Sequence, residues 1–213
     1  MARCKKKQQL PTDAQLKQAR DLVGLNYVTL ESTMETVRLA KPGVKIDFGG
    51  IGKGLALDLA AQTLKKHGLK HALIDGGTSS VLAIGAPPGR KGWTVRFRHP
   101  YNKDLERIEG VVIKDESLAT SSNEGRYYAV DGKQIGHIFD PRTGWPVEND
   151  VLSATAIGPS ATDCDALSTA FYVMGREKTE AYCKSHPEIR AILMMDQQGE
   201  LQTVRINFTE EQT

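Results

Sequence analysis

The sequence predicts an α+β fold, because a strand-rich middle lies between segments of helical periodicity near both ends. The strand-like runs are short, rich in apolar and β-branched residues, and bounded by Gly, Pro, Asn or Asp. The helical segments repeat their apolar residues at spacings of three and four. No linker separates these segments, so we expect one domain over residues 12–213, preceded by a disordered basic segment over residues 1–11.

Four segments carry helical signals. In the first, Thr12 or Asp13 can act as the N-terminal cap. The second ends near Gly68, a residue type favoured just beyond a helix C-terminus. Gly175 stops the third and separates it from the fourth. The expected helices are residues 12–23, 54–68, 162–174 and 177–185.

Strand-like runs account for much of the remaining chain. Asp131-Gly132 is a favoured two-residue hairpin turn, and the turn signal at residues 197–199 indicates a closing hairpin. The expected strands are residues 26–30, 36–40, 71–74, 81–84, 93–98, 108–113, 126–130, 136–139, 151–157, 190–195 and 201–208.

Charge and cysteine content exclude several classes of protein. Lys and Arg number 28 against 26 Asp and Glu, and a net charge of +2 is too balanced to predict nucleic-acid binding. No apolar run approaches the roughly 18 residues of a membrane span, and the basic start has no apolar run after it, unlike a signal peptide. The unpaired spacing of Cys4, Cys164 and Cys183 indicates reduced thiols. The sequence as given therefore predicts a cytoplasmic protein.

Residues 45–58 are rich in glycine and include Lys53 at an expected helix N-terminus. Free backbone N–H groups and the helix dipole favour an anion such as phosphate at such a position. The segment is not a Walker A loop, because Asp47 stands at its first glycine and Gly54 replaces its Ser or Thr. A tight strand-to-helix turn without a ligand explains the pattern equally well.

Residues 137–144 combine an imidazole, a carboxylate and a guanidinium in one loop, at His137, Asp140 and Arg142. Loops of this composition often carry function. The alternative is a structural turn in which Asp140 accepts backbone hydrogen bonds and Arg142 is solvated. For His137 alone, that alternative is the simpler interpretation.

Residues 162–175 place Asp165 and Thr169 four positions apart, on one face of the expected helix. A carboxylate and a hydroxyl are hard oxygen donors, which suit Mg²⁺. The alternative is a polar helix face on which Thr169 bonds back to a carbonyl. The pair alone does not establish a metal site.

Together these segments resemble the FAD:protein FMN transferases, known as the ApbE family. That family carries Asp-Leu-Gly-Gly-Ile-Ala-Lys-Gly with a following Asp, then a Gly-Gly turn, His-Ile-x-Asp-Pro-x-Thr-Gly and Ala-Asp-Ala-Leu-x-Thr. The corresponding segments here are residues 47–58, 75–77, 137–144 and 164–169, and residues 120–123 stand near the family's Thr-Ser-Gly element. The resemblance runs from about residue 13 to the end. It corresponds to the C-terminal two-thirds of the family, with the N-terminal part absent.

The resemblance implies an α+β fold of the ApbE type, related to the T-fold, with helices packed on a mixed sheet. It implies Mg²⁺-dependent transfer of the FMN phosphoryl group from FAD to a Thr or Ser hydroxyl of a target protein, with release of AMP. The alternatives are a non-catalytic module that binds FAD or another nucleotide, and an inactive fragment. Family members are often periplasmic or membrane-anchored, and a homodimer is a further expectation.

The resemblance also implies roles for individual residues. His137 would position or activate the acceptor hydroxyl, and the carbonyl of Gly52 would join two side chains as metal ligands. The metal ligands are Gly52, Asp165 and Thr169. The residues expected around FAD are Asp47, Lys53, Asp58, Gly76, Gly77, Thr78 and Ser121.

Overall fold

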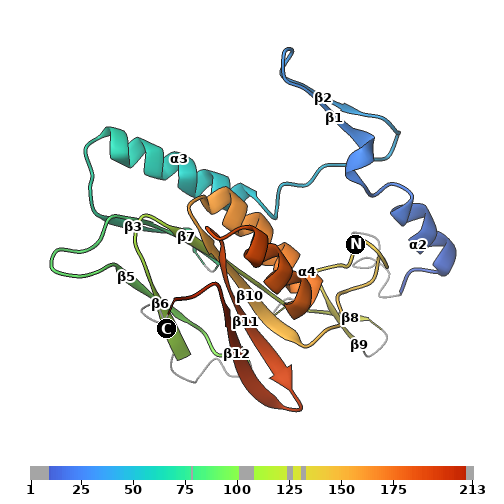
Figure 1. Ribbon diagram of the computed structural model, residues 1–213. Helices are drawn as coiled ribbons and strands as arrows, with labels where there is room; N and C mark the ends of the chain where they lie inside the picture. The colour runs from blue at the N-terminus through green and yellow to red at the C-terminus, as the bar shows by residue number, and fades with distance from the viewer. Residues whose placement is uncertain (1–9, 78, 101–107, 124–126, 131–132, 210–213) are drawn as a thin grey trace. The chain divides into compact units, whose positions relative to one another are not determined.

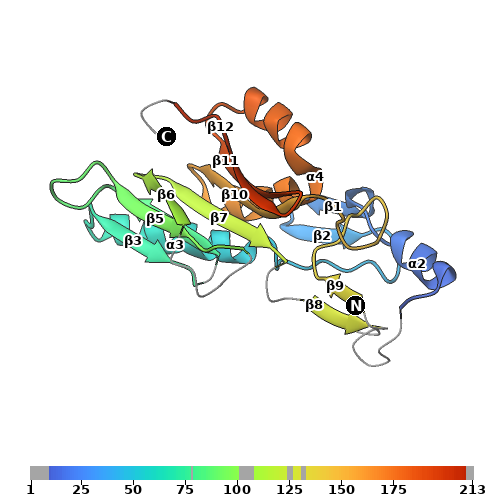
Figure 2. The ribbon, with the colours of Figure 1, turned by 90° about the horizontal axis from the view of Figure 1, so that it is seen from below.

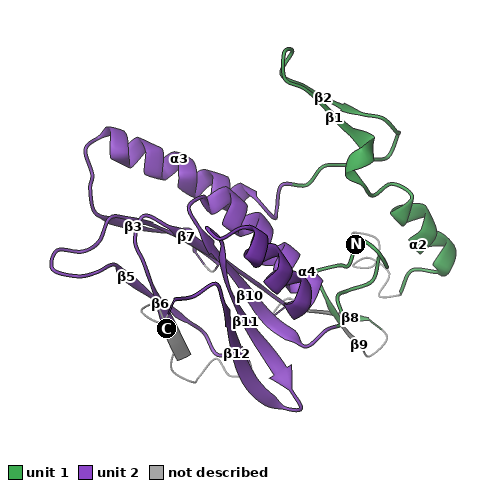
Figure 3. Ribbon diagram, in the orientation of Figure 1, with its two compact units in different colours: residues 1–47, 125–148 green, residues 48–124, 149–213 purple. Residues whose placement is uncertain are grey.

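The computed structural model describes residues 10–77, 79–100, 108–123, 127–130 and 133–209 (Figure 1). The chain divides into two compact units (Figure 3). Unit 1 contains residues 1–47 and 125–148, and unit 2 contains residues 48–124 and 149–213.

Unit 2 is built on a six-stranded sheet with the strand order β12-β11-β10-β7-β4-β3. Every pair of neighbouring strands is antiparallel, so the sheet is antiparallel where a mixed one was expected. The outermost pairs, β3–β4 and β11–β12, are hairpins, which can only be antiparallel. The strands are β3 (Ala72–Asp75), β4 (Ser80–Ile84), β7 (Ser117–Ser122), β10 (Val151–Gly158), β11 (Arg190–Gln197) and β12 (Glu200–Ile206).

Two helices, α3 (Gly52–Lys66) and α4 (Ala161–Ser185), contact each other and the sheet (Figure 1). α4 is kinked at Gly175, whose backbone φ of 75° is not helical. The kink corresponds to the boundary expected between two helices at this residue. A compact apolar cluster joins the helices to β4, and its buried members are Leu57, Ala61, Leu82, Ile84 and Ala161.

The hairpin of β5 (Trp93–Phe97) and β6 (Ile108–Ile113) covers the other face of the sheet. Side chains alternate between faces along a strand, so Ala83 of β4 lies opposite Leu82 and Ile84. In Figure 2 the hairpin lies toward the viewer with α3 behind it. The buried residues of this second cluster are Ala83, Phe97, Val111, Ile113, Leu118, Ile157, Ile192 and Met194.

Unit 1 contains α2 (Asp13–Arg20), a 3₁₀ turn (Leu25–Tyr27) and two hairpins. Thr12 caps α2, because its hydroxyl accepts from the Gln15 N–H while the Gln15 side chain accepts from the Thr12 N–H. The hairpin strands are β1 (Val28–Glu31), β2 (Thr36–Leu39), β8 (Tyr127–Val130) and β9 (Lys133–Gly136).

The predicted α+β class is confirmed, and most elements lie within a few residues of their expected positions. The strand expected at residues 136–139 was placed too late, because the chain bends at His137 after Gly136 and Phe139 pairs only in an isolated bridge with Pro146. Strand β7 was missed altogether. The turn at Asp131-Gly132 and most of the basic segment at residues 1–11 lie outside the described residues.

Cys164 and Cys183 are free and buried, as expected for reduced thiols. Burial raises the pKa of Cys164 to about 12 and that of Cys183 to about 11, so both thiols are protonated near neutral pH. In the described part of the chain, no helix is both long and apolar enough to cross a bilayer.

Candidate active site

The entry into α3 forms one wall of the candidate site in unit 2. The N–H groups of Ile51 and Gly52 both donate to the Phe48 carbonyl and close the turn before the helix. Gly54 lies directly against the start of α4, and a Cβ there would collide with the backbone of Ala161 and Thr162. Glycine at this position therefore permits the close approach of the two helices. A Cβ at Gly52 would meet open space.

Asp165 is the central carboxylate of the site and only 4% of its surface is exposed. Its Oδ2 accepts a 3.0 Å hydrogen bond from the Gly54 N–H. Its Oδ1 lies 3.5 Å from Ser80 Oγ and 3.8 Å from Lys53 Nζ, both long for a hydrogen bond. A buried carboxylate is unfavourable unless well compensated, so the weakly held Oδ1 favours a cation nearby.

Thr169 follows Asp165 by one helical turn and bonds to strand β7. The Ser121 hydroxyl lies 2.9 Å from Thr169 Oγ1 and 2.9 Å from Ser168 Oγ. Ser168 in turn donates to the Asp165 carbonyl at 3.0 Å. The structure therefore links Lys53 to Asp165 at the start of α3, and Thr169 to Ser121 one helical turn further along α4. All four residues were expected from the sequence.

Sequence reasoning did not identify Ser80 or Ser168. Ser80 is 1% exposed and comes from β4, and Ser168 is 1% exposed on α4. A signal for Ser168 was present, because it directly precedes Thr169 on the expected helix. Ser80 could not be placed beside Asp165 without knowing that β4 and α4 are in contact.

Asp58 connects α3 to the first turn of α4. Its Oδ1 accepts from the Ala161 N–H at 2.9 Å, and its Oδ2 accepts from the Thr162 N–H at 2.9 Å and hydroxyl at 2.6 Å. Burial by itself raises the pKa of this carboxyl, but the hydrogen bonds from Thr162 and Ala161 outweigh it and the pKa is lowered. Asp58 therefore supplies the acceptors that the free N–H groups at the start of α4 require.

Gly76 and Gly77 lie in the turn that follows β3 and leads into β4. Asp75 Oδ1 accepts from the Gly77 N–H at 2.9 Å, and the Gly76 N–H donates to the Ser80 carbonyl at 2.8 Å. Gly77 has a φ of 97°, which favours glycine. Thr78, also expected at the flavin, lies outside the described residues.

Asp47 and His137 belong to unit 1, where Asp47 is exposed and His137 is half-buried. In the loop after His137, Asp140 accepts from the Arg142 N–H at 2.8 Å and from its guanidinium at 2.6 Å. This hydrogen bond and the charge of Asp140 raise the pKa of Arg142. Asp140 therefore accepts a backbone hydrogen bond within the turn, as expected in the structural alternative. The alternative did not anticipate that the guanidinium of Arg142, which was expected to be solvated, pairs with Asp140.

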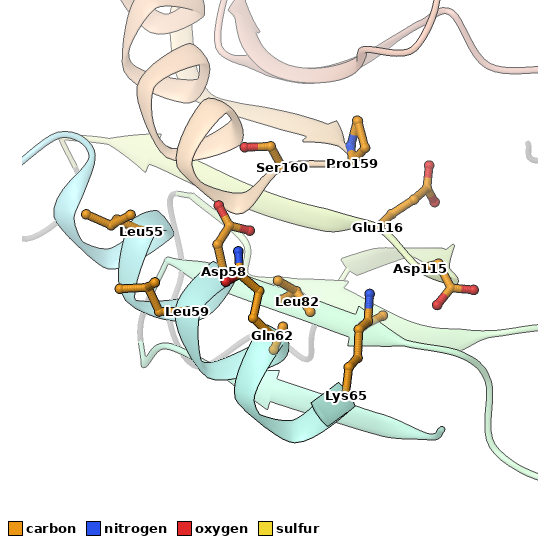
Figure 4. Close-up of a pocket in the computed structure, with 12 residues that line it drawn as sticks. Leu55, Asp58, Leu59, Gln62, Lys65, Leu82, Asp115, Glu116, Pro159 and Ser160 are labelled. Atoms are coloured by element: carbon orange, nitrogen blue, oxygen red, sulfur yellow. The ribbon is translucent and has the colours of Figure 1, made fainter. Parts of the chain in front are cut away.

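A separate pocket of about 400 Å³ lies beside α3 and the start of α4 (Figure 4). Its carboxylates already have partners: Asp58 caps α4, Asp115 accepts from the Gly85 N–H at 2.8 Å, and Glu116 binds Arg190. Figure 4 shows Asp58 reaching from α3 toward the first turn of α4. All three carboxylates that line this pocket are therefore already used in contacts within the protein.

Comparison with known proteins identifies one family. The model of the ApbE family matches residues 2–193. A FAD:protein FMN transferase of Treponema pallidum is 36% identical over 167 residues, which cover 75% of this chain and 46% of the relative. A FAD:protein FMN transferase of Escherichia coli K12 is 28% identical over 90% of this chain and 54% of the relative. The chain thus spans about half the length of these curated relatives.

Solved structures show the same fold. The ApbE protein of Thermotoga maritima has a TM-score of 0.80 and 31% identity, over 93% of this chain and 62% of that one. The flavin transferase ApbE of Vibrio cholerae has a TM-score of 0.78 and 26% identity, over 92% of this chain and 61% of that one. Both comparisons confirm the ApbE-like architecture predicted from the sequence.

Proposed function

The chain belongs to the ApbE family, and from this premise we propose that it transfers FMN from FAD to a Thr or Ser hydroxyl of a target protein. The observation that carries the proposal is the buried Asp165 carboxylate, with one oxygen held by Gly54 and the other only weakly compensated. Thr169 presents a hydroxyl one turn later on α4, and the glycine-rich start of α3 contacts Asp165 through the Gly54 N–H.

The proposed reaction is a phosphoryl transfer. The acceptor hydroxyl oxygen forms a bond to the FMN phosphorus of FAD, the pyrophosphate P–O bond breaks, and AMP leaves with the bridging oxygen. The hydroxyl proton passes to a base, for which we propose His137 from its place in the matched motif. The substrate phosphates would meet Lys53 and the backbone N–H groups at the start of α3.

The donor atoms of the site fit Mg²⁺. Asp165 Oδ1, Thr169 Oγ1 and the Gly52 carbonyl are hard oxygen ligands, which Mg²⁺ prefers over nitrogen and sulfur. The weak pairing of Asp165 Oδ1 leaves this oxygen suited to a cation. A bound Mg²⁺ would neutralise the charge that develops on the phosphates.

A transfer assay tests the proposal. The full chain is incubated with FAD, Mg²⁺ and a protein that contains a Thr flavinylation site, and the acceptor is examined by in-gel flavin fluorescence and by its mass. We expect covalent FMN on the acceptor and AMP in solution, with loss of both in Asp165→Asn. The matched control is Asp163→Asn, which removes an exposed carboxylate from the same helix.

The assay also separates the alternative functions. Retention of FAD without covalent transfer would replace the proposal with a flavin-binding module. Absence of both binding and transfer would identify the chain as inactive in isolation.

A further inference from the structure

Three hydroxyl groups beside the candidate metal position form a continuous chain. Ser168 Oγ is 3.0 Å from the Asp165 carbonyl, Ser121 Oγ is 2.9 Å from Ser168 Oγ, and Thr169 Oγ1 is 2.9 Å from Ser121 Oγ. Each hydroxyl has one proton to donate and lone pairs with which to accept. The direction of every hydrogen bond in the chain can therefore be worked out from its fixed end.

The fixed end is the Asp165 carbonyl, which can only accept. Ser168 uses its one proton in the bond to this carbonyl, so it must accept from Ser121. Ser121 then has no proton left for Thr169, so Thr169 donates to Ser121. The Thr169 proton is thereby directed toward Ser121 on β7, and the lone pairs of Thr169 Oγ1 point away from Ser121.

We propose that Ser121 and Ser168 are positioning residues that hold the Thr169 hydroxyl with its lone pairs available to a divalent cation. The inference rests on the proposed metal site and assigns its orientation to two residues that would not touch the metal. A hydroxyl can ligate a cation only through a lone pair, so a proton turned toward the metal would oppose binding. The chain of three hydroxyl groups fixes the Thr169 hydroxyl in this favourable orientation before a metal binds.

Two features make this arrangement rigid. Ser168 is 1% exposed on α4, so its hydroxyl cannot turn to solvent. Ser121 is held by the pairing of β7 with β10, where it stands opposite Ala154. The bond from Ser168 also occupies the Asp165 carbonyl, the acceptor to which a helical Thr169 would otherwise bond back.

The adjacent residue provides a matched control. Thr120 precedes Ser121 on β7, so its side chain faces the opposite side of the sheet. Its hydroxyl lies 2.8 Å from that of Thr155, which is 2% exposed. Thr120→Val therefore removes a hydroxyl and leaves a buried partner, as Ser121→Ala does, but away from Asp165 and Thr169.

The test measures cation affinity directly. Mn²⁺ is titrated into the full chain and the free ion is followed by electron paramagnetic resonance, with Mg²⁺ as competitor. We expect Ser121→Ala and Ser168→Ala to weaken binding by about 10-fold or more, the usual effect of removing a hydrogen-bond partner of a metal ligand. Ser121→Thr, which keeps the hydroxyl, and Thr120→Val should bind like the unaltered chain.

The outcomes separate this inference from the metal site itself. Asp165→Asn should abolish binding; if it does while Ser121→Ala binds normally, the site stands and the inference is overturned. Equal weakening by Ser121→Ala and Thr120→Val, or by Ser121→Ala and Ser121→Thr, would attribute the effect to packing and also overturn it. No binding by the unaltered chain would remove the metal site and the inference together.

Discussion

The N–H of Gly54 donates a 3.0 Å hydrogen bond to Asp165 Oδ2, and this bond joins the first turn of α3 to α4. A second connection lies one turn further along α3, where Asp58 caps the start of α4. The two connections fix the glycine-rich entry of α3 relative to the carboxylate of Asp165. The candidate site therefore depends on how closely these helices approach each other.

Gly54→Ala is expected to destabilise the protein by about 2 kcal/mol or more, because the new methyl group collides with backbone atoms of α4 that cannot move aside easily. Gly52→Ala is the control, since a methyl group there meets no atom within 4 Å. Its stability should change by less than about 1 kcal/mol. Urea unfolding of both variants measures the difference, and equal stability would show that α3 and α4 are not tightly packed at Gly54.

Asp58→Asn is expected to lower the free energy of unfolding by about 1 kcal/mol at neutral pH, because the amide keeps only one of the two oxygens that accept hydrogen bonds from the start of α4. The folded pKa of Asp58 lies below its unfolded value of 3.8, so its contribution is present above that pH and is lost as the pH falls through the folded pKa. The advantage of the unaltered protein over Asp58→Asn should therefore shrink below about pH 4. Unfolding curves at several pH values measure it, and a constant advantage would contradict the capping role.

The sequence predicted the pairing of Asp165 and Thr169 on one helix face, because the helical repeat alone determines it. Strand β7 escaped prediction because Ser117–Ser122 contains a single large apolar residue, Leu118. Its hydroxyls resemble those of a loop, but Ser117 donates to the Val81 carbonyl and Thr120 bonds to Thr155. These hydrogen-bond partners lie on neighbouring strands, so they can be identified only from the folded structure.

The role of Asp58 shows the same limit. Its position in the motif led to an expected place around the flavin, and that expectation stays a prediction. Its three hydrogen bonds to the start of α4 join residues more than 100 positions apart in the chain. Sequence spacing carries no information on such a contact, whereas the folded structure shows it directly.

The ion pair between Arg190 and Glu116 should contribute measurably to stability. Arg190 donates from its NH2 group to both carboxylate oxygens at 2.8 and 2.7 Å, and its side chain is 6% exposed. Glu116→Gln removes the charge that compensates this buried guanidinium, with an expected loss of about 1–3 kcal/mol. The control is Glu180→Gln in the exposed pair with Arg176, which should lose less than about 0.5 kcal/mol. Equal effects in urea unfolding would show that Arg190 gains little from its partner.

Lys53 is expected to compete with a cation for Asp165. Its ammonium group lies 3.8 Å from Asp165 Oδ1, the carboxylate oxygen proposed to bind the metal. Because like charges repel, Lys53→Met should tighten the binding of Mn²⁺ to the chain without flavin by a few-fold. The same variant should bind FAD more weakly, since the lysine is then missing from the proposed phosphate position.

The two opposite effects distinguish a local electrostatic role from general damage to the fold. Lys66→Met is the control, because this exposed lysine lies in the last turn of α3, about 20 Å along the helix from Lys53. It should leave both affinities unchanged. Weaker binding of both Mn²⁺ and FAD by Lys53→Met would indicate a disturbed helix entry, and unchanged binding of both would remove Lys53 from the site.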